Sequence, residues 1–224
     1  MWRERTAVLL GQNGVDRLEN SHVCVIGIGG VGGYVCMMLA RAGVGNLTLV
    51  DFDKVDETNI NRQVVANVKT VGKLKTEVMK DMISEINPNC NVTVVSERFN
   101  KKLAEDLFKE RFDYVVDAID SVNDKVDLIE FCKNNDINIV SAMGAGNRKN
   151  IPEFKVIDIY KTYNDGLAKV MRKKLRERQI ISLDVVTCIE KAEKIEENVV
   201  GSISYYPAMC GCVLAAFVIN KLII

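Results

Sequence analysis

The sequence has a single histidine among its 224 residues, and that scarcity limits the chemistry the chain can do. His22 stands at the start of an apolar run, where a residue at the edge of a β-strand is expected. A Ser-His-Asp triad or a histidine-rich metal site would therefore lack its histidine. No C-x-x-C pair is present either, which argues against a tetrahedral zinc site.

The cysteines are scattered, and the charges balance. An odd number of thiols indicates reduced cysteines in a cytoplasmic protein, and the seven are Cys24, Cys36, Cys90, Cys132, Cys188, Cys210 and Cys212. Thirty Lys and Arg residues match thirty Asp and Glu residues, so a nucleic-acid partner would need a local basic patch.

Neither end of the sequence has the pattern of an export signal or a typical membrane span. The first residues, MWRERTAVLL, carry charges among apolar positions and do not resemble a signal peptide. The apolar stretch from Pro207 to Ile224 contains Lys221 and is marginally short for a membrane span, so we expect a buried core or interface helix. No stable membrane insertion and a cytoplasmic location are the corresponding predictions.

Short β-branched runs alternate with helical patterns over the first 143 residues, as in VCVIGI, NLTLVD, NVTVVS, DYVVDAI and INIVSAM. The predicted helices between the runs cover 31–42, 73–86, 103–110 and 123–134. This alternation predicts an α/β fold, a Rossmann-like, doubly wound and mainly parallel sheet.

The pattern changes after residue 143. EFKVIDIYK, SLDVVTC and SISYYP are predicted to be later strands, antiparallel in part, that extend the sheet. The charged stretch EKAEKIEENVVG is predicted to be a mobile loop. We therefore expect one domain over 1–224, with a nucleotide-binding core at 1–143 and an extension at 144–224 that holds a basic helix and a C-terminal helix.

Glycines interrupt the first apolar run. GIGGVG fits G-x-G-x-x-G: Gly27 allows a tight turn, Gly29 and Gly30 let the backbone approach a phosphate, and Gly32 lets the following helix lie close to the strand. Asp51 follows 19 residues after Gly32, where its carboxylate can accept hydrogen bonds from ribose hydroxyls. A nucleotide is the expected ligand, and a glycine turn without a ligand is the alternative.

Polar residues beyond the acid favour a triphosphate over a dinucleotide, whose pyrophosphate needs only the glycine turn. They are Asn59, Asn61, Arg62, Gln63, Lys73 and Lys75. A guanidinium and an ammonium can neutralise the extra phosphate charge. Asp117 and Asp120 lie at the end of the fourth run, where a carboxylate can hold Mg²⁺. If Arg62 and Lys75 are considered alone, the alternative interpretation is that both are solvated surface charges without a ligand.

The chain resembles the ThiF-type adenylating proteins, relatives of ubiquitin-activating enzymes, most clearly in the stretch GIGGVGGYVCMMLARAGVGNLTLVDFDKVDETNINRQ. The resemblance covers nearly the whole chain. RTAVLLGQNGVDRL, the segment around GAGN and the Asp158–Thr162 D-x-x-K-T segment narrow the resemblance to the tRNA threonylcarbamoyladenosine dehydratases. The resemblance implies ATP-dependent adenylation of the threonyl carboxylate on adenosine 37 of tRNA. The carbamoyl group then closes a ring and expels AMP.

The resemblance also implies a role for each matching residue. Gly30 would lie under the phosphates of ATP, and Asp51 would hold the ribose. Along the triphosphate would lie Asn59, Asn61 and Arg62, with Lys75 near the α-phosphate. Asp120 would hold Mg²⁺ with Ser121 beside it, and the catalytic set would be Arg62, Lys75 and Asp120. Arg5 resembles an arginine inserted into a partner subunit's site, which implies a homodimer. The loop at 188–201 is shorter than in relatives.

Three other functions compete with this one. The first is activation of a ubiquitin-like sulfur carrier, which would bring a sulfur-relay protein as partner; the others are NAD-dependent oxidoreduction and nucleotide binding without chemistry. A thiol relay needs an exposed cysteine of low pKa, and Cys188 near the charged loop is the one candidate, because Cys210 and Cys212 are expected to be buried.

The tRNA itself could meet a local basic segment, KVMRKKLRERQ. It contains Lys169, Arg172, Lys173, Lys174, Arg176 and Arg178. At helical spacing, residues 169, 172, 173 and 176 share one face that could track phosphates, and a solvated helix face is the alternative.

Overall fold

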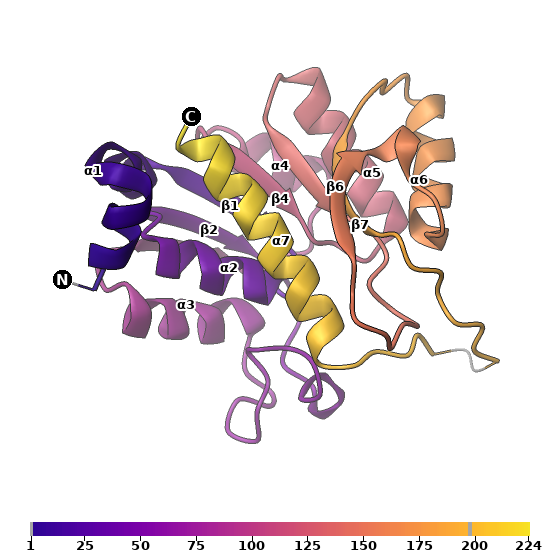
Figure 1. Cartoon of the computed structure of the whole chain (residues 1–224), viewed down its shortest axis with the longest axis horizontal. Coiled ribbons are helices and arrows are strands. Elements are labelled where there is room, and N and C mark those ends of the chain that lie inside the picture. Colours follow the sequence, from indigo (N-terminus) through magenta and orange to yellow (C-terminus); the bar gives the residue numbers. More distant parts are fainter. Residues whose placement is uncertain (1, 197–198) are drawn as a thin grey trace.

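A single seven-stranded sheet forms the centre of the structure, a computed structural model that describes residues 2–196 and 199–224 (Figure 1). The strand order is β3-β2-β1-β4-β5-β7-β6. The strands are β1 (His22–Ile26), β2 (Asn46–Val50), β3 (Asn91–Val95), β4 (Tyr114–Asp117), β5 (Ile139–Ala142), β6 (Phe154–Asp158) and β7 (Asp184–Cys188). All neighbouring strands pair in parallel except β6, which pairs antiparallel with β7. The predicted mainly parallel sheet with an antiparallel extension is confirmed.

Helices cover both faces of this sheet. They are α1 (Glu4–Asn20), α2 (Gly32–Ala42), α3 (Lys75–Ile86), α4 (Lys101–Leu107), α5 (Val122–Asn134), α6 (Gly166–Glu177) and α7 (Tyr205–Leu222), with short 3₁₀ turns η1 (Glu57–Asn59) and η2 (Ile159–Lys161). In Figure 1, α1, α2, α3 and α7 lie in front of the sheet, and α4, α5 and α6 lie on the far side. Parallel strands buried on both faces read as continuous apolar runs, which is why the first runs were recognisable.

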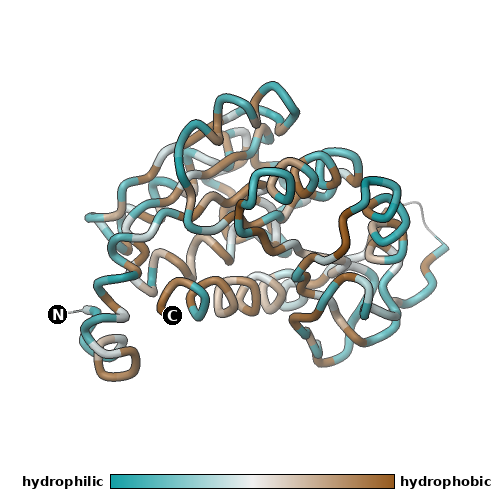
Figure 2. Tube along the Cα trace, turned by 90° about the horizontal axis from the view of Figure 1, so that it is seen from above, coloured by the Kyte–Doolittle hydropathy of each residue, from teal (hydrophilic) through white to brown (hydrophobic). Residues whose placement is uncertain are grey.

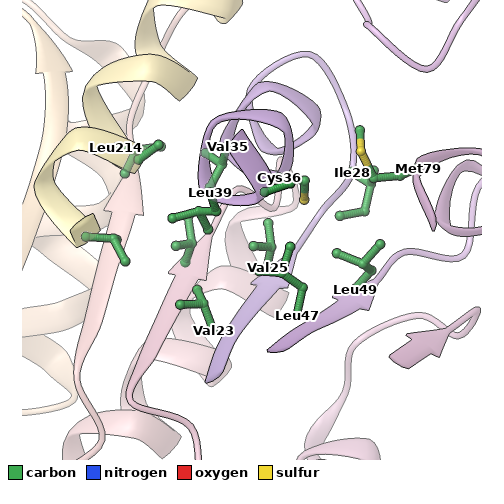
Figure 3. Close-up of a cluster of buried hydrophobic side chains, with 14 of the residues drawn as sticks. Val23, Val25, Ile28, Val35, Cys36, Leu39, Leu47, Leu49, Met79 and Leu214 are labelled. Atoms are coloured by element: carbon green, nitrogen blue, oxygen red, sulfur yellow. The ribbon is translucent and has the colours of Figure 1, made fainter. Parts of the chain in front are cut away.

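Two apolar cores fill the space between the sheet and the two helix layers. In the core under α2, Val35 and Leu39 meet Val25 and Leu47 of the two adjacent strands (Figure 3). Cys24 and Ile26, whose side chains alternate with these, point into the second core with α5 and α6. The glycine turn is therefore held between two rigid layers.

One predicted strand is wrong. SISYYP does not form a strand, because Tyr205 and Tyr206 begin α7. The helix contacts α2 closely through Gly211, where a Cβ would lie 2.5 Å from the carbonyl oxygen of Val31. This packing brings Pro207 beside Gly30, so the start of α7 forms one wall of the glycine turn.

By length and composition α7 could cross a membrane, although core helices of soluble proteins meet the same test. Its mostly apolar character is visible as the brown and white helix beside the C-terminus in Figure 2. In the structure α7 packs on α2 and on the strands β4–β7, and 39% of its residues are buried. This position agrees with the expected core or interface helix.

The charged stretch at 190–201, predicted to be mobile, lies partly outside the described residues, since 197 and 198 are not described. On either side of them the chain is tied to the GAGN segment, where Asn147 accepts a hydrogen bond from Gly201 N–H at 2.6 Å and its carbonyl accepts one from Glu193 N–H at 2.7 Å.

Candidate nucleotide site

A cavity of about 470 Å³ opens at the carboxyl ends of β1, β2 and β4. The strand order reverses between β1 and β4, and the crevice at such a switch point is where open α/β sheets bind ligands. Gly27, Gly29 and Gly30 line the floor. The sequence-based prediction of a phosphate-facing turn at this place therefore agrees with the geometry.

The glycines differ in what they do for the turn. Gly27 has φ +93°, a conformation that L side chains rarely adopt. At Gly32 a Cβ would lie only 1.8 Å from the carbonyl oxygen of Gly27, so the start of α2 can pack here only without a side chain. At Gly29 the nearest atom is the Gln63 side-chain nitrogen at 3.9 Å, an ordinary van der Waals contact, so a Cβ fits there without displacing a neighbour.

Asp51 holds the turn as well as facing the cavity. One carboxylate oxygen accepts the Ile28 N–H at 2.6 Å, and the other accepts the Asp53 N–H at 2.8 Å. Burial raises the pKa of Asp51, and these two N–H donors partly oppose that rise. Each oxygen keeps a lone pair that could accept a ribose hydroxyl, so ribose binding stays a prediction with a structural basis.

Lys75 and Arg62 both line the cavity, but they are held differently. Lys75 is 5% exposed, and its ammonium contacts Asp53 at 2.8 Å. Arg62 is partly buried, and its guanidinium donates to the Thr58 carbonyl at 3.0 Å and to the Asn61 side chain at 2.9 Å. Two cations thus stand near one glycine turn, as the triphosphate interpretation requires.

Asn59 and Asn61 do not reach the cavity lining. Asn59 is buried, and its side-chain oxygen accepts the Asp56 N–H at 3.1 Å within the cap of η1. Asn61 donates to the Ser202 carbonyl at 3.2 Å. Both side chains act here on the local backbone and on Arg62, and their contact with a triphosphate stays a prediction.

Asp117, the last residue of β4, and Asp120, which follows the strand, have separate environments. Asp117 is fully buried and accepts hydrogen bonds from Lys125 at 2.8 Å and from Ser141 at 2.6 Å, so it is not available to a metal. Asp120 is exposed at the cavity wall with Ser121 beside it, and no ion pair engages it in the part of the chain that the structure describes. Of the two carboxylates, Asp120 can meet a cation.

Two polar groups at the cavity could contact a ligand: Gln63, which the sequence places with Arg62 and Lys75, and Ser202, which sequence reasoning missed. Gln63 is 8% exposed, and its Oε1 has no hydrogen-bond partner among the described residues; the same holds for Ser202 Oγ. A buried polar atom without a partner costs free energy, so a bound molecule that pairs with it would recover that cost. Asp53 was also missed, although the D-x-D spacing with Asp51 is a local signal.

Arg5 lies apart from this cavity. It is exposed on α1, which runs directly into the beginning of β1 at the opposite end of the sheet. Arg5 could therefore meet a nucleotide only in another copy of the chain, and the homodimer stays a prediction.

The cysteines do not form a reactive site. Cys188, the one candidate for a thiol relay, lies fully buried in β7 with its Sγ 3.9 Å from the Tyr206 hydroxyl, so it does not offer the exposed thiol that such a relay needs. Cys212 is exposed on α7, contrary to the prediction, and partial burial still raises its pKa. Cys210 is buried, as predicted, and its pKa is raised to about 12.

His22 is a strand-edge residue, as predicted. It begins β1, and its Nε2 lies 2.8 Å from the Thr48 hydroxyl. Burial lowers its pKa, which favours the neutral ring. Among the described residues, no group of three or more His, Cys, Asp or Glu side chains could hold a metal ion.

The fold is Rossmann-like, and Arg62, Lys75 and Asp120 line the cavity together with its glycine turn. These features place the chain in the class of nucleotide-binding α/β proteins. Comparison with known proteins is specific: the ThiF family model matches residues 3–223. The chain belongs to the ThiF family, in the branch of the tRNA threonylcarbamoyladenosine dehydratases.

Relatives with that name resemble the chain closely. The Bacillus subtilis tRNA threonylcarbamoyladenosine dehydratase is 43% identical over 79% of this chain and 69% of its own length. The Haemophilus influenzae one is 45% identical over 72% of this chain and 62% of its own length. The chain thus spans about two thirds of the curated relatives it matches.

Solved structures extend the likeness to the fold. Crystal structures of the Escherichia coli tRNA N6-threonylcarbamoyladenosine dehydratase in complex with AMP and with ATP superpose with TM-scores of 0.93 and 0.91. Both are 35% identical, and both alignments cover 99% of this chain and 94% of that one.

Proposed function

We propose that this chain uses ATP to dehydrate and cyclise the threonylcarbamoyl side chain on adenosine 37 of tRNA. The observation that carries the proposal is the convergence of the glycine turn, Arg62, Lys75 and Asp120 on one cavity, in a chain 43% identical to a dehydratase of that name. The dehydratase whose structures hold AMP and ATP has the same fold, which supports ATP as the nucleotide.

The reaction balances without a protein nucleophile. A carboxylate oxygen of the substrate attacks the α-phosphorus of ATP, and the bond to pyrophosphate breaks. The carbamoyl nitrogen then attacks the activated carbonyl carbon, loses its proton to solvent, and AMP leaves with the former carboxylate oxygen. The substrate has lost one water in total, and ATP has become AMP and pyrophosphate.

The protein's contribution is charge and position. Attack on ATP brings two anions together, and charge develops on the α-phosphate as it gains its fifth ligand. Arg62 and Lys75, already held by hydrogen bonds, can meet that charge without reorganisation. The second step needs mainly alignment, because the nitrogen and the carbonyl carbon belong to one side chain.

Mg²⁺ suits this site through Asp120. Mg²⁺ in phosphate sites is usually held by one or two carboxylates together with phosphates and water. The exposed carboxylate of Asp120, which has no ion-pair partner among the described residues, matches that donor set. The ion would supply positive charge beside the phosphates. Asp117 is excluded from this role by its pairing with Lys125.

A homodimer in which Arg5 serves the partner's cavity belongs to the proposal, since Arg5 is exposed and distant from the cavity of its own chain. A sulfur-relay protein is a further proposed partner. The competing function, activation of a ubiquitin-like sulfur carrier, is less favoured because Cys188 is buried and the described residues offer no cysteine cluster for zinc.

The test is mass spectrometry of tRNA nucleosides before and after incubation with the protein, ATP and Mg²⁺. We expect the threonylcarbamoyl nucleoside to lose the mass of one water, with AMP released in equal amount. Omitting ATP should abolish the change. An unaltered nucleoside with a protein that binds ATP would refute the proposal.

A further inference from the structure

One surface of α6 carries exposed cations that form no ion pair among the described residues. Lys169, Lys173 and Arg176 are exposed and occur at i, i+4 and i+7, so they share one side of the helix. We call these three residues the α6 basic face. At 1.5 Å per residue the face extends over about 10 Å of the helix axis. Glu177 is the one acidic residue of the helix.

Arg172 and Arg178, two other cations of the segment, bind to groups of the protein itself. Arg172 donates to the Thr162 carbonyl at 3.0 Å and to its hydroxyl. Arg178 pairs with Glu130 and lies 3.7 Å from Asp127. The sequence predicts a basic face made of residues 169, 172, 173 and 176. Arg172 does not belong to it, because its side chain binds Thr162 in the loop before the helix.

The α6 basic face differs from these internal contacts. Lys169 and Lys173 make no ion pair or hydrogen bond through their side chains within the described residues. Arg176 lies over the ring of Tyr160 at 5.0 Å, which orients the guanidinium without neutralising it. Three charges thus remain for a partner.

The helix stands next to the candidate nucleotide site. It packs on α5, as seen at the right of Figure 1, and Lys174 reaches Asn123 in the first turn of α5 at 3.2 Å. Asn123 lies two residues beyond Ser121, which lines the cavity together with Asp120. A strand of RNA that entered the cavity over the start of α5 would continue along α6.

Two acids of α5 close to this path, Asp124 and Asp127, are paired with cations of the protein. Asp124 pairs with Arg98 at 2.8 Å, and Asp127 lies 3.9 Å from Lys101 as well as beside Arg178. These ion pairs neutralise the charges of Asp124 and Asp127 on α5. The α6 basic face is therefore not cancelled by its neighbour, although the whole chain has no net charge.

We infer that the α6 basic face binds the phosphate backbone of the tRNA substrate and leads the modified adenosine into the cavity. The inference rests on the proposed function. Its physical basis is charge complementarity: exposed Lys and Arg residues that meet phosphates release counterions, and a neutral protein can bind RNA only through such a local patch.

The test compares two triple variants that lose equal charge. One is Lys169→Gln, Lys173→Gln, Arg176→Gln; the control is Arg41→Gln, Lys80→Gln, Lys155→Gln, three exposed cations on other elements. The affinity for purified tRNA carrying threonylcarbamoyladenosine is measured from 50 to 200 mM salt, at about 25 °C. ATP affinity by calorimetry reports on folding, because no substituted residue lines the cavity.

We expect the α6 triple variant to bind tRNA at least about tenfold more weakly at low salt, and its slope of log affinity against log salt to shrink by about 2–3. The control should keep the wild-type slope. Equal slopes for the α6 variant and the wild-type protein would overturn the inference. If the triple variant loses ATP binding, the single substitutions Lys169→Gln and Lys173→Gln decide, each with an expected slope change of about 0.7–0.9.

The outcome separates this inference from the proposed function. A slope that falls in the α6 variant, in a protein that never dehydrates the nucleoside, keeps the RNA surface and rejects the reaction. Dehydration by the α6 variant with an unchanged KM for tRNA keeps the reaction and rejects the surface.

Discussion

The ammonium of Lys75 lies 2.8 Å from a carboxylate oxygen of Asp53, at the point where β2 ends and α3 begins. The backbone repeats the link, because the Lys75 N–H donates to the Asp53 carbonyl at 3.0 Å. Lys75 is buried, whereas the Asp53 side chain is 47% exposed. The cation is thus fixed at the cavity wall by an acid that water still reaches.

Lys75→Ala and Arg62→Ala should each lower kcat more than they lower ATP affinity. Both cations stand where charge develops on the α-phosphate, and loss of one preorganised charge typically costs about 10²–10³ in kcat. Single-turnover kinetics and calorimetry separate the two quantities. Lys80→Ala, an exposed residue on the same helix as Lys75, is the control and should leave turnover unchanged. Near-normal turnover in either cavity variant would reject its assigned role.

Asp53→Asn should weaken catalysis by acting through Lys75. The amide keeps the size of the side chain but removes the charge that holds the ammonium, and we expect a fall in kcat of about tenfold from misplacement of the cation. In a Lys75→Ala background the same substitution should have no further effect, because the shared interaction is already gone. An additive loss in the double variant would show that Asp53 acts independently.

Asp117→Asn should destabilise the fold. Asp117 and Lys125 are both fully buried, and removal of one partner from a buried ion pair typically costs about 3–5 kcal/mol. The measurement is the free energy of unfolding in urea. Asp106→Asn, which breaks an exposed ion pair with Lys109, should leave the urea midpoint unchanged. A small effect at Asp117 would mean that Ser141 and water compensate for the lost charge.

Alanine at two glycines of the turn should give opposite results. Gly32→Ala places a methyl group 1.8 Å from the Gly27 carbonyl oxygen and should lower the free energy of unfolding by about 3 kcal/mol or more. Gly29→Ala meets nothing nearer than 3.9 Å and should fold normally. Its methyl group would still face the phosphates and weaken ATP binding by about tenfold, or 1.4 kcal/mol. Thermal unfolding and calorimetry on both variants decide; equal stabilities would contradict the assigned difference.

The glycine turn, Asp51 and the parallel sheet were predictable because each depends on a short local pattern. Side-chain contacts between different helices, strands and loops were not predictable from the sequence. Nothing local distinguishes Asp117 from Asp120; the difference comes from Lys125, which lies near the start of the following helix α5 and is buried with Asp117. The exposed stripe of the basic helix was likewise altered by the Arg172–Thr162 contact.

The start of α7 shows a different limit. Its first residues include two tyrosines, which favour strands, and Ser204 occupies the N-cap position without making a capping hydrogen bond through its side chain. Packing against α2 through Gly211 overrides that local preference. The same packing fixes which cysteines of α7 are exposed, which explains why Cys212 was misplaced.

The final prediction concerns covalent chemistry: the reaction should proceed without a thioester on the enzyme. The carbamoyl nitrogen and the activated carboxyl carbon belong to one side chain, so their effective concentration is already high and a thiol relay would add a step without lowering the barrier. The structure adds that Cys188 is fully buried beside Tyr206, where an activated substrate cannot reach its sulfur.

Cys188→Ser tests this prediction, because the hydroxyl keeps a similar size and is a far weaker nucleophile at neutral pH. We expect kcat within about twofold of the wild-type value, since only a nucleophilic role would require the sulfur. Cys212→Ser, at the exposed thiol of α7, is the matched control and should behave in the same way. Loss of turnover in Cys188→Ser alone, with ATP binding and the urea midpoint intact, would contradict the prediction. It would favour activation of a sulfur carrier, because a covalent acyl intermediate then becomes necessary.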